Sequence, residues 1–105
     1  MSAIPAKARD AARSRFDGKC ARCGSNGAEH HHRQRRREGG HGFWNLVLLC
    51  PTDHKWAHAN PEAARENGYI ISVHHDNPAS APIRTYAGWA LFPEQGGVEW
   101  IDNNK

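Results

Sequence analysis

The chain has 105 residues, 38 % of them hydrophobic, and a formal net charge of +3 at pH 7. This length predicts a single domain, 1–105, whose limited core would benefit from a metal ion or another cross-link. No stretch approaches the roughly 18 apolar residues of a membrane helix, and no secretory leader is recognisable. We therefore expect an intracellular protein that is neither secreted nor bound to a membrane.

The charge is distributed unevenly along the chain. Residues 1–58 contain eleven Lys or Arg and five Asp or Glu, whereas residues 59–105 contain three and six. A basic first half followed by an acidic second half is typical of a nucleic-acid-binding face joined to a solubilising or partner-facing segment. An ordinary solvated surface is the alternative interpretation.

The first predicted element is a basic helix over Ile4 to Phe16, which starts near Pro5 and stops at Asp17-Gly18. The segment 19–27 follows, with two cysteines in a Cys-x-x-Cys spacing and glycines behind them, a pattern typical of a metal-binding turn. Since no signal peptide is recognisable, the three cysteines are better interpreted as thiolate ligands than as a disulfide framework.

Three consecutive histidines and four arginines lie within residues 28–38. We predict a short strand here, a loop at 39–42, and a second strand over 45–50 that runs back antiparallel to the first. Because arginine stays protonated and its planar fork pairs with two phosphate oxygens, the stretch suggests chemistry on a phosphate backbone. The candidate phosphate contacts are Arg33, Arg35, Arg36 and Arg37, with a solvated charged loop as the alternative.

After Pro51 the pattern changes to helix, with Thr52 as the predicted N-cap. Asn60-Pro61-Glu62 predicts a second cap, where the helix ends, bends or restarts, and Gly68 closes the helical region. Strands are expected over 69–74, 82–92 and 96–101. This C-terminal extension, 69–105, either caps the core or presents a partner surface, and no motif decides between the two.

Histidines on the predicted strand and helix are expected to converge. His54 and His58 are four residues apart, so a helix places both imidazoles on one face. Pairing of the two predicted strands brings His31 to the opening turns of that helix. Three imidazoles around one cation are therefore expected.

In order and spacing, these residues resemble the HNH nuclease family. The match comprises His31-His32, Gly39-Gly40, the segment 45–50 and His54 with His58, and it covers about residues 18–68. The chain looks most like the small HNH nucleases of tailed bacteriophages, whose genes often neighbour DNA-packaging genes. The resemblance implies an α+β domain with a ββα-metal (His-Me finger) core and a zinc-knuckle-like Cys-x-x-Cys turn, to which the N-terminal basic helix and the C-terminal β extension are added.

The resemblance also implies roles for single residues. The family places its general base seven residues before the first loop glycine, which selects His32. One catalytic divalent ion would be bound by His31, His54 and His58, and Asn45 would close the loop or orient the base. Mg²⁺, Mn²⁺, Ni²⁺ and Zn²⁺ all stay open, because imidazoles favour softer metals whereas the family often uses Mg²⁺ or Mn²⁺. The surface or loop histidines would be His30, His41, His74 and His75.

A second metal site is predicted at the cysteines. Cys20-x-x-Cys23 with Cys50-x-x-Asp53 resembles the four-ligand spacing of the structural zinc site of many HNH proteins, with aspartate in place of the fourth cysteine. Aspartate can bind zinc but is a less usual partner for three thiolates. The alternative is a remnant site of buried thiols.

The predicted function is metal-dependent hydrolysis of DNA phosphodiester bonds, largely independent of sequence, in phage DNA processing or packaging. Packaging proteins such as terminase are the candidate partners. One alternative is a non-catalytic zinc-knuckle or HNH-like module that binds DNA or docks on a packaging machine. A hydrolase of small phosphate esters is another, although the arginine-rich loop argues for a polymer. The choices between nicking and double-strand cleavage, and between DNA and RNA, stay open.

Overall fold

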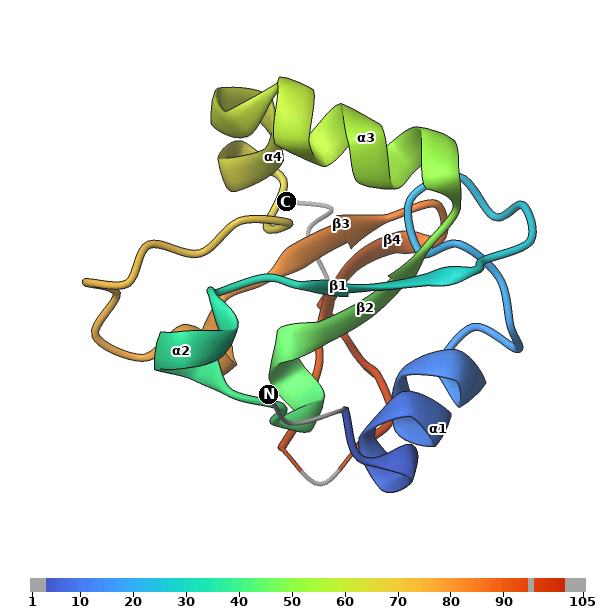
Figure 1. Ribbon diagram of the computed structural model, residues 1–105, viewed down its shortest axis with the longest axis horizontal. Coiled ribbons are helices and arrows are strands. Elements are labelled where there is room, and N and C mark those ends of the chain that lie inside the picture. Colours follow the sequence, from blue (N-terminus) through green and yellow to red (C-terminus); the bar gives the residue numbers. More distant parts are fainter. Residues whose placement is uncertain (1–3, 95, 102–105) are drawn as a thin grey trace.

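The computed structural model describes residues 4–94 and 96–101 and shows a mixed α+β protein with two small antiparallel sheets (Figure 1). The α+β class predicted from the sequence is confirmed. In chain order the elements are α1 (Ala6–Ser14), β1 (Glu29–His32), α2 (Arg36–Gly39), η1 (Phe43–Asn45), β2 (Leu46–Leu49), α3 (Pro51–Ala59), α4 (Pro61–Glu66), η2 (Pro78–Ser80), β3 (Ile83–Thr85), β4 (Gly88–Leu91) and β5 (Glu99–Trp100).

The predicted N-terminal helix is confirmed as α1. It begins directly after Pro5, and its inward-facing Ala8 and Ala12 pack against Leu46 of β2. Small side chains on this face allow the helix to lie close to the strand. The chain leaves the helix through Asp17 and Gly18, which have φ angles of 58° and 81°, so the predicted stop signal acts through the left-handed conformation that glycine adopts most readily.

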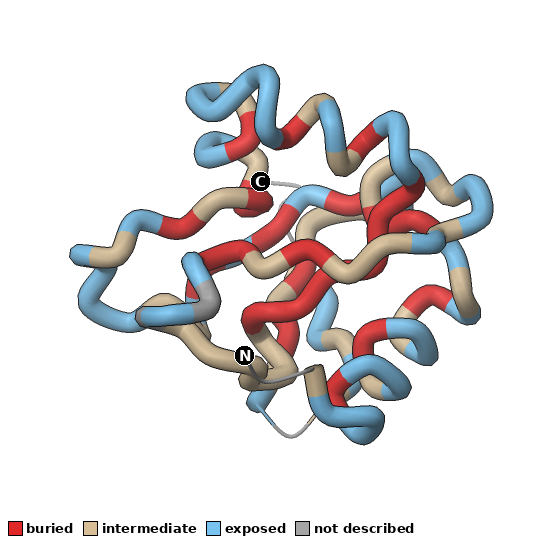
Figure 2. Tube along the Cα trace, in the orientation of Figure 1, coloured by how far each residue is buried: buried red, intermediate tan, exposed pale blue. Residues whose placement is uncertain are grey.

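The histidine strand and the apolar strand pair antiparallel, as predicted. In the register of β1 with β2, His31 lies opposite Val47 and His32 opposite Leu46. All four residues of β2 are buried, and the tube coloured by burial is continuously red along this strand (Figure 2). A strand buried on both faces needs cover on both, and α1 and α3 both contact it.

The expected loop after β1 contains one turn of helix, α2, followed by the 3-10 turn η1. Glycine is required at positions 39 and 40 of this loop for two different reasons. A Cβ at Gly39 would lie 2.7 Å from Asn45 Nδ2, and Gly40 has a φ of 65°. The loop therefore folds tightly around the Asn45 side chain, and a larger residue at Gly39 would displace it.

The start of α3 differs from the prediction by two residues. Cys50, not Thr52, is the N-cap: its Sγ accepts the backbone N–H of Asp53 at 3.4 Å, and Pro51 occupies the first helical position. Proline suits that position because its φ is already helical and its missing N–H has no partner there in any case. The predicted restart at Asn60-Pro61 is confirmed by α4.

The C-terminal extension completes the core. Its strands form the sheet β3-β4-β5, and Ile83 and Ala90 from this sheet, with Phe92 directly after β4, join a buried cluster with Phe16 and Val47. The expected strand at 69–74 is absent: no residue of this stretch lies in a strand. It contacts β1 and the residue that follows it through two hydrogen bonds, from His31 Nε2 to the Tyr69 carbonyl at 2.6 Å and from Ile71 N–H to the Arg33 carbonyl at 2.9 Å. Among the described residues, no helix is long and apolar enough to span a membrane.

Candidate metal centres

Strand β1 and helix α3 bring together the three histidines that were predicted to share a cation. One ligand nitrogen from each of His31, His54 and His58 lies within 4.8 Å of the other two. The ring centroids are 5.2 Å apart for His31 and His54, 5.6 Å for His31 and His58, and 5.0 Å for His54 and His58. Four-residue spacing on α3 supplies two of the rings, and the β1–β2 pairing supplies the third.

The His31 ring is held by a hydrogen bond on its far side. Its Nε2 lies 2.6 Å from the carbonyl oxygen of Tyr69, and the side chain is buried. Since a carbonyl only accepts, Nε2 carries the proton and the lone pair is on Nδ1. This is the tautomer and orientation that a metal-binding histidine usually receives from a backbone carbonyl.

Glu29 orients the His54 ring in the same way, and the sequence analysis did not predict this role. Its Oε1 lies 2.6 Å from His54 Nδ1, which leaves Nε2 as the ligand nitrogen. Glu29 lies two residues before His31 on the same strand, so the two side chains share a face. Strand alternation could therefore have identified it. With both rings oriented and His58 exposed beside them, the cluster fits a divalent cation that accepts imidazole ligands.

Burial keeps His31 neutral. The pKa of His31 is lowered to about 4, first by burial and then by its neighbours His54, His58 and His32, with the Tyr69 carbonyl acting in the opposite direction. A neutral imidazole is the form that binds metal, so at pH 7 no proton has to leave His31 before an ion binds.

This pKa shift predicts a loss of stability in mild acid. Because the folded-state pKa lies below the ordinary value of about 6.5, the unfolded chain takes up the proton first as the pH falls. The contribution is complete above pH 6.5 and decreases towards pH 4, by about 2 kcal/mol between pH 7 and pH 5. Urea unfolding of protein dialysed free of loosely held metal should show this slope in the wild type and lose it in His31→Gln. An unchanged slope in that variant would assign the effect to other groups.

The predicted general base, His32, has a histidine partner, His41, that the sequence analysis predicted only as a surface or loop residue. His32 Nε2 lies 3.1 Å from Nδ1 of His41, so one ring donates its N–H to the other. His41 belongs to the loop that Asn45 holds in place. The sequence feature that could have predicted this contact is the position of His41 between the loop glycines, in the loop that follows β1.

Asn45 closes this loop, one of the two roles predicted for it. The side chain is fully buried, and its Oδ1 accepts the Gln34 backbone N–H at 2.6 Å. Its Nδ2 donates to the carbonyls of Gln34 and Gly40 at 2.9 and 2.8 Å. Both ends of the amide are satisfied by the backbone of the loop, so Asn45 acts on the histidines through loop position.

Arg33 was predicted to contact phosphates, and that prediction is wrong. The side chain is 2 % exposed, and its guanidinium donates to the carbonyls of Gly68, Trp44 and Ala81 at 2.7, 2.9 and 2.8 Å. Burial, followed by the charge of Arg15, lowers the pKa of Arg33 to about 9, so it is still charged at pH 7. The Arg33 guanidinium therefore joins three segments of the chain by donating hydrogen bonds to their backbone carbonyls.

The other predicted arginines differ in position. Arg35 is exposed and lines a cleft of about 670 Å³ together with His32 and His58. Arg37 is exposed on α2, and the side chain of Arg36 lies outside the described part of the structure.

The cysteines converge with Asp53, as predicted. The ligand atoms of Cys20, Cys23, Cys50 and Asp53 all lie within 4.8 Å of one another. All three cysteines are free, with Cys23 Sγ 3.9 Å from Cys50 Sγ. Burial raises the pKa of Cys20 to about 12, and its thiol donates to Asp53 Oδ2 at 3.1 Å. Three sulfurs and one carboxylate form a donor set that fits zinc, which would displace the thiol protons.

Arg22 explains how an aspartate can occupy the fourth position. Its guanidinium donates to Asp53 Oδ1 at 2.7 Å and lies 3.6 Å from the centroid of the Trp56 ring. Burial alone would raise the pKa of Asp53, but hydrogen bonds from Cys23, Cys20, Arg22 and Cys50 outweigh it and hold this pKa below its usual value. One carboxylate oxygen is thus fixed from outside while the other faces the sulfurs.

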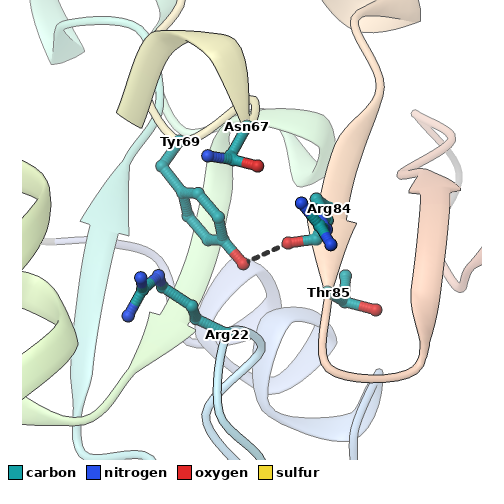
Figure 3. Close-up of a pocket in the computed structure, with 5 residues that line it drawn as sticks. All are labelled: Arg22, Asn67, Tyr69, Arg84 and Thr85. Carbon is teal, nitrogen blue, oxygen red and sulfur yellow. Dashed lines mark hydrogen bonds between the residues drawn. The ribbon is translucent and has the colours of Figure 1, made fainter. Parts of the chain in front are cut away.

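A polar pocket of about 320 Å³ lies next to this cluster, and none of the predicted site residues lines it. Figure 3 shows its lining residues, with the Tyr69 hydroxyl donating to the Arg84 carbonyl at 2.5 Å. Thr85 Oγ1 donates to the Gly88 carbonyl at 2.7 Å. Both hydroxyl protons are therefore bonded to backbone carbonyls. None of the residues that line the pocket is a candidate ligand of either metal centre.

Comparison of the chain with protein-family models, with curated proteins and with solved structures gives no match in any of the three.

Proposed function

We propose that the chain is a metal-dependent HNH endonuclease that hydrolyses DNA phosphodiester bonds, and that β1, β2 and α3 form its ββα-metal core. The observation that carries the proposal is the convergence of His31, His54 and His58 within 4.8 Å, with His32 opening into the same cleft as His31 and His58. This combination supplies a cation site and a candidate base side by side, which phosphodiester hydrolysis requires.

In this proposal each protein group has a defined task. Neutral His32 takes a proton from the attacking water, and His41 holds its ring in place. Asn45 fixes the loop that carries His41, and Arg35 and Arg37 contact phosphates with little base readout. A bound divalent ion would supply neutralisation of the charge that develops on the phosphate and the leaving oxygen. The cysteine cluster would hold a structural zinc.

The test is plasmid cleavage by wild type, His32→Ala and the matched control His74→Ala, which changes an exposed histidine outside the cleft. Protein dialysed free of loosely held metal would receive Mg²⁺, Mn²⁺, Ni²⁺ or Zn²⁺ one at a time. Wild type and His74→Ala should nick or linearise the plasmid, whereas His32→Ala should be slower by about 100-fold or more, because a general base contributes that much.

A module that binds DNA without cutting it, or docks on a packaging machine, is the second candidate. The exposed Arg35 and Arg37 favour it equally well, since phosphate contacts require no chemistry. If none of the three proteins cuts with any metal while all of them retard DNA in a gel at low salt, this candidate replaces the nuclease. Competition between plasmid and a small phosphate ester tests the remaining alternative.

A further inference from the structure

We propose that Arg65 of α4 makes a phosphate-binding site in the cleft beside the histidine cluster, where it holds the phosphodiester adjacent to the one that is cleaved. The proposal rests on the proposed function for the identity of the polymer. It adds a residue from outside the histidine and arginine stretch and assigns a position on the DNA strand to it.

The lining of the cleft indicates an anionic ligand. His32 and His58 lie along it, Arg35 and Arg65 contribute cationic side chains, and Ile70 and Val73 form an apolar part of the wall. None of the described residues that line this cleft is acidic. A cleft with cations, imidazoles and no carboxylate attracts phosphate and disfavours cationic ligands.

The Arg65 side chain is available for such a ligand. It is exposed, and among the described residues it has no hydrogen bond or ion pair. Arg22 and Arg33, in contrast, are occupied by Asp53 and by backbone carbonyls. Arg65 lines the same cleft as the candidate base His32. Its planar guanidinium can therefore donate hydrogen bonds to two oxygens of one phosphate.

The position of Arg65 is fixed by its helix. The preceding residue, Ala64, is fully buried in the core. The helix end is held by Asn67, whose side chain donates to the Ala63 carbonyl at 2.8 Å and whose own carbonyl accepts the Arg84 backbone N–H at 2.9 Å. Arg65 is therefore presented from an anchored helix on the wall of the same cleft as His32, so a DNA strand whose scissile phosphate lies at His32 can bring its neighbouring phosphate to Arg65. The sugar between the two phosphates would contact Ile70 and Val73, which read no sequence.

The experiment measures DNA binding without cleavage. A short fluorescein-labelled DNA duplex would be titrated with His32→Ala protein, with the same protein carrying Arg65→Gln, and with a matched control carrying Arg84→Gln. Arg84 is an exposed arginine on β3 that does not line the cleft. We expect Arg65→Gln to weaken binding about tenfold and to reduce the slope of log Kd against log salt by about one phosphate contact, with no such change for Arg84→Gln. In the active enzyme, Arg65→Gln should raise KM with little effect on kcat.

The outcomes separate the two proposals. If Arg65→Gln and Arg84→Gln give the same affinity and salt slope, the Arg65 site is overturned, whatever the result of plasmid cleavage. If the wild type cuts no plasmid but Arg65→Gln still loses the phosphate contact, the site stands and the nuclease does not. A His32→Ala protein that binds no duplex at any salt concentration overturns the Arg65 site, and plasmid cleavage by the wild type then decides the nuclease separately.

Discussion

Removal of the structural zinc proposed for the cluster of Cys20, Cys23, Cys50 and Asp53 is expected to unfold the protein near room temperature. The cluster joins the turn before β1 to the first turn of α3, and in a chain of 105 residues the hydrophobic core alone provides a modest margin. Structural zinc sites contribute about 10 kcal/mol or more of apparent binding free energy, which is comparable to the whole stability of a small domain. Without the metal, these segments are joined by thiol–carboxylate hydrogen bonds and by the ion pair of Arg22 with Asp53.

Thermal unfolding followed by circular dichroism, with and without a strong chelator, measures this effect. We expect the midpoint to fall by more than about 20 °C and to recover when zinc is returned. Two exposed side chains, one from each centre, give a matched comparison. Cys23→Ser should lower the unfolding midpoint equally with and without the chelator, so that adding the chelator has no further effect. His58→Ala should still show the fall in midpoint when the chelator is added. A midpoint that does not change on chelation would mean that the cysteines are buried thiols without a metal.

Replacement of Arg33 by methionine is expected to lower the free energy of unfolding by about 3 kcal/mol or more. Methionine fills much of the same space but leaves the carbonyls of Trp44, Gly68 and Ala81 without their donor. Each buried acceptor that loses its partner costs about 1–3 kcal/mol, and relief from burying a charge offsets a part of this sum. The variant should be folded at low temperature and unfold at lower urea concentration.

The matched control is Arg84→Met, since Arg84 is an exposed arginine on β3. Urea unfolding of the two variants should differ by most of the expected loss. DNA binding at low temperature provides a second measurement, because a buried Arg33 makes no phosphate contact and its replacement should leave the salt slope unchanged. Equal stabilities for the two variants, or a reduced salt slope for Arg33→Met, would contradict the role found for Arg33.

The parts that sequence analysis predicted correctly depend on short-range patterns. Four-residue spacing places His54 and His58 together on α3, and an apolar strand after a glycine loop places His31 beside them. The spacing Cys50-x-x-Asp53 likewise brings a thiol and a carboxylate together at the start of α3, where the N-cap geometry joins them. In each case the relevant geometry is set within a few residues or by one hairpin.

The parts that it missed depend on long-range partners. The acceptors of Arg33 lie 11, 35 and 48 residues away, so no local pattern distinguishes this arginine from its exposed neighbours. The strand expected at 69–74 has an apolar pattern of the right kind, but the chain offers it one backbone bond to Arg33 in place of a partner strand. Strand propensity describes a residue's fit to a sheet and cannot supply the neighbour.

The Tyr69 carbonyl that orients His31 sets a lower limit on the length of a working fragment. A chain cut after residue 68, where the motif ends, would retain all seven candidate metal ligands and lose the atom that fixes the tautomer of the buried one. It would also lose the Ala81 carbonyl, which accepts a hydrogen bond from Arg33 as the carbonyls of Gly68 and Trp44 do. The motif is therefore shorter than the unit that can carry it, and fragments or fusions of this domain should keep β3 and β4 together with the histidines.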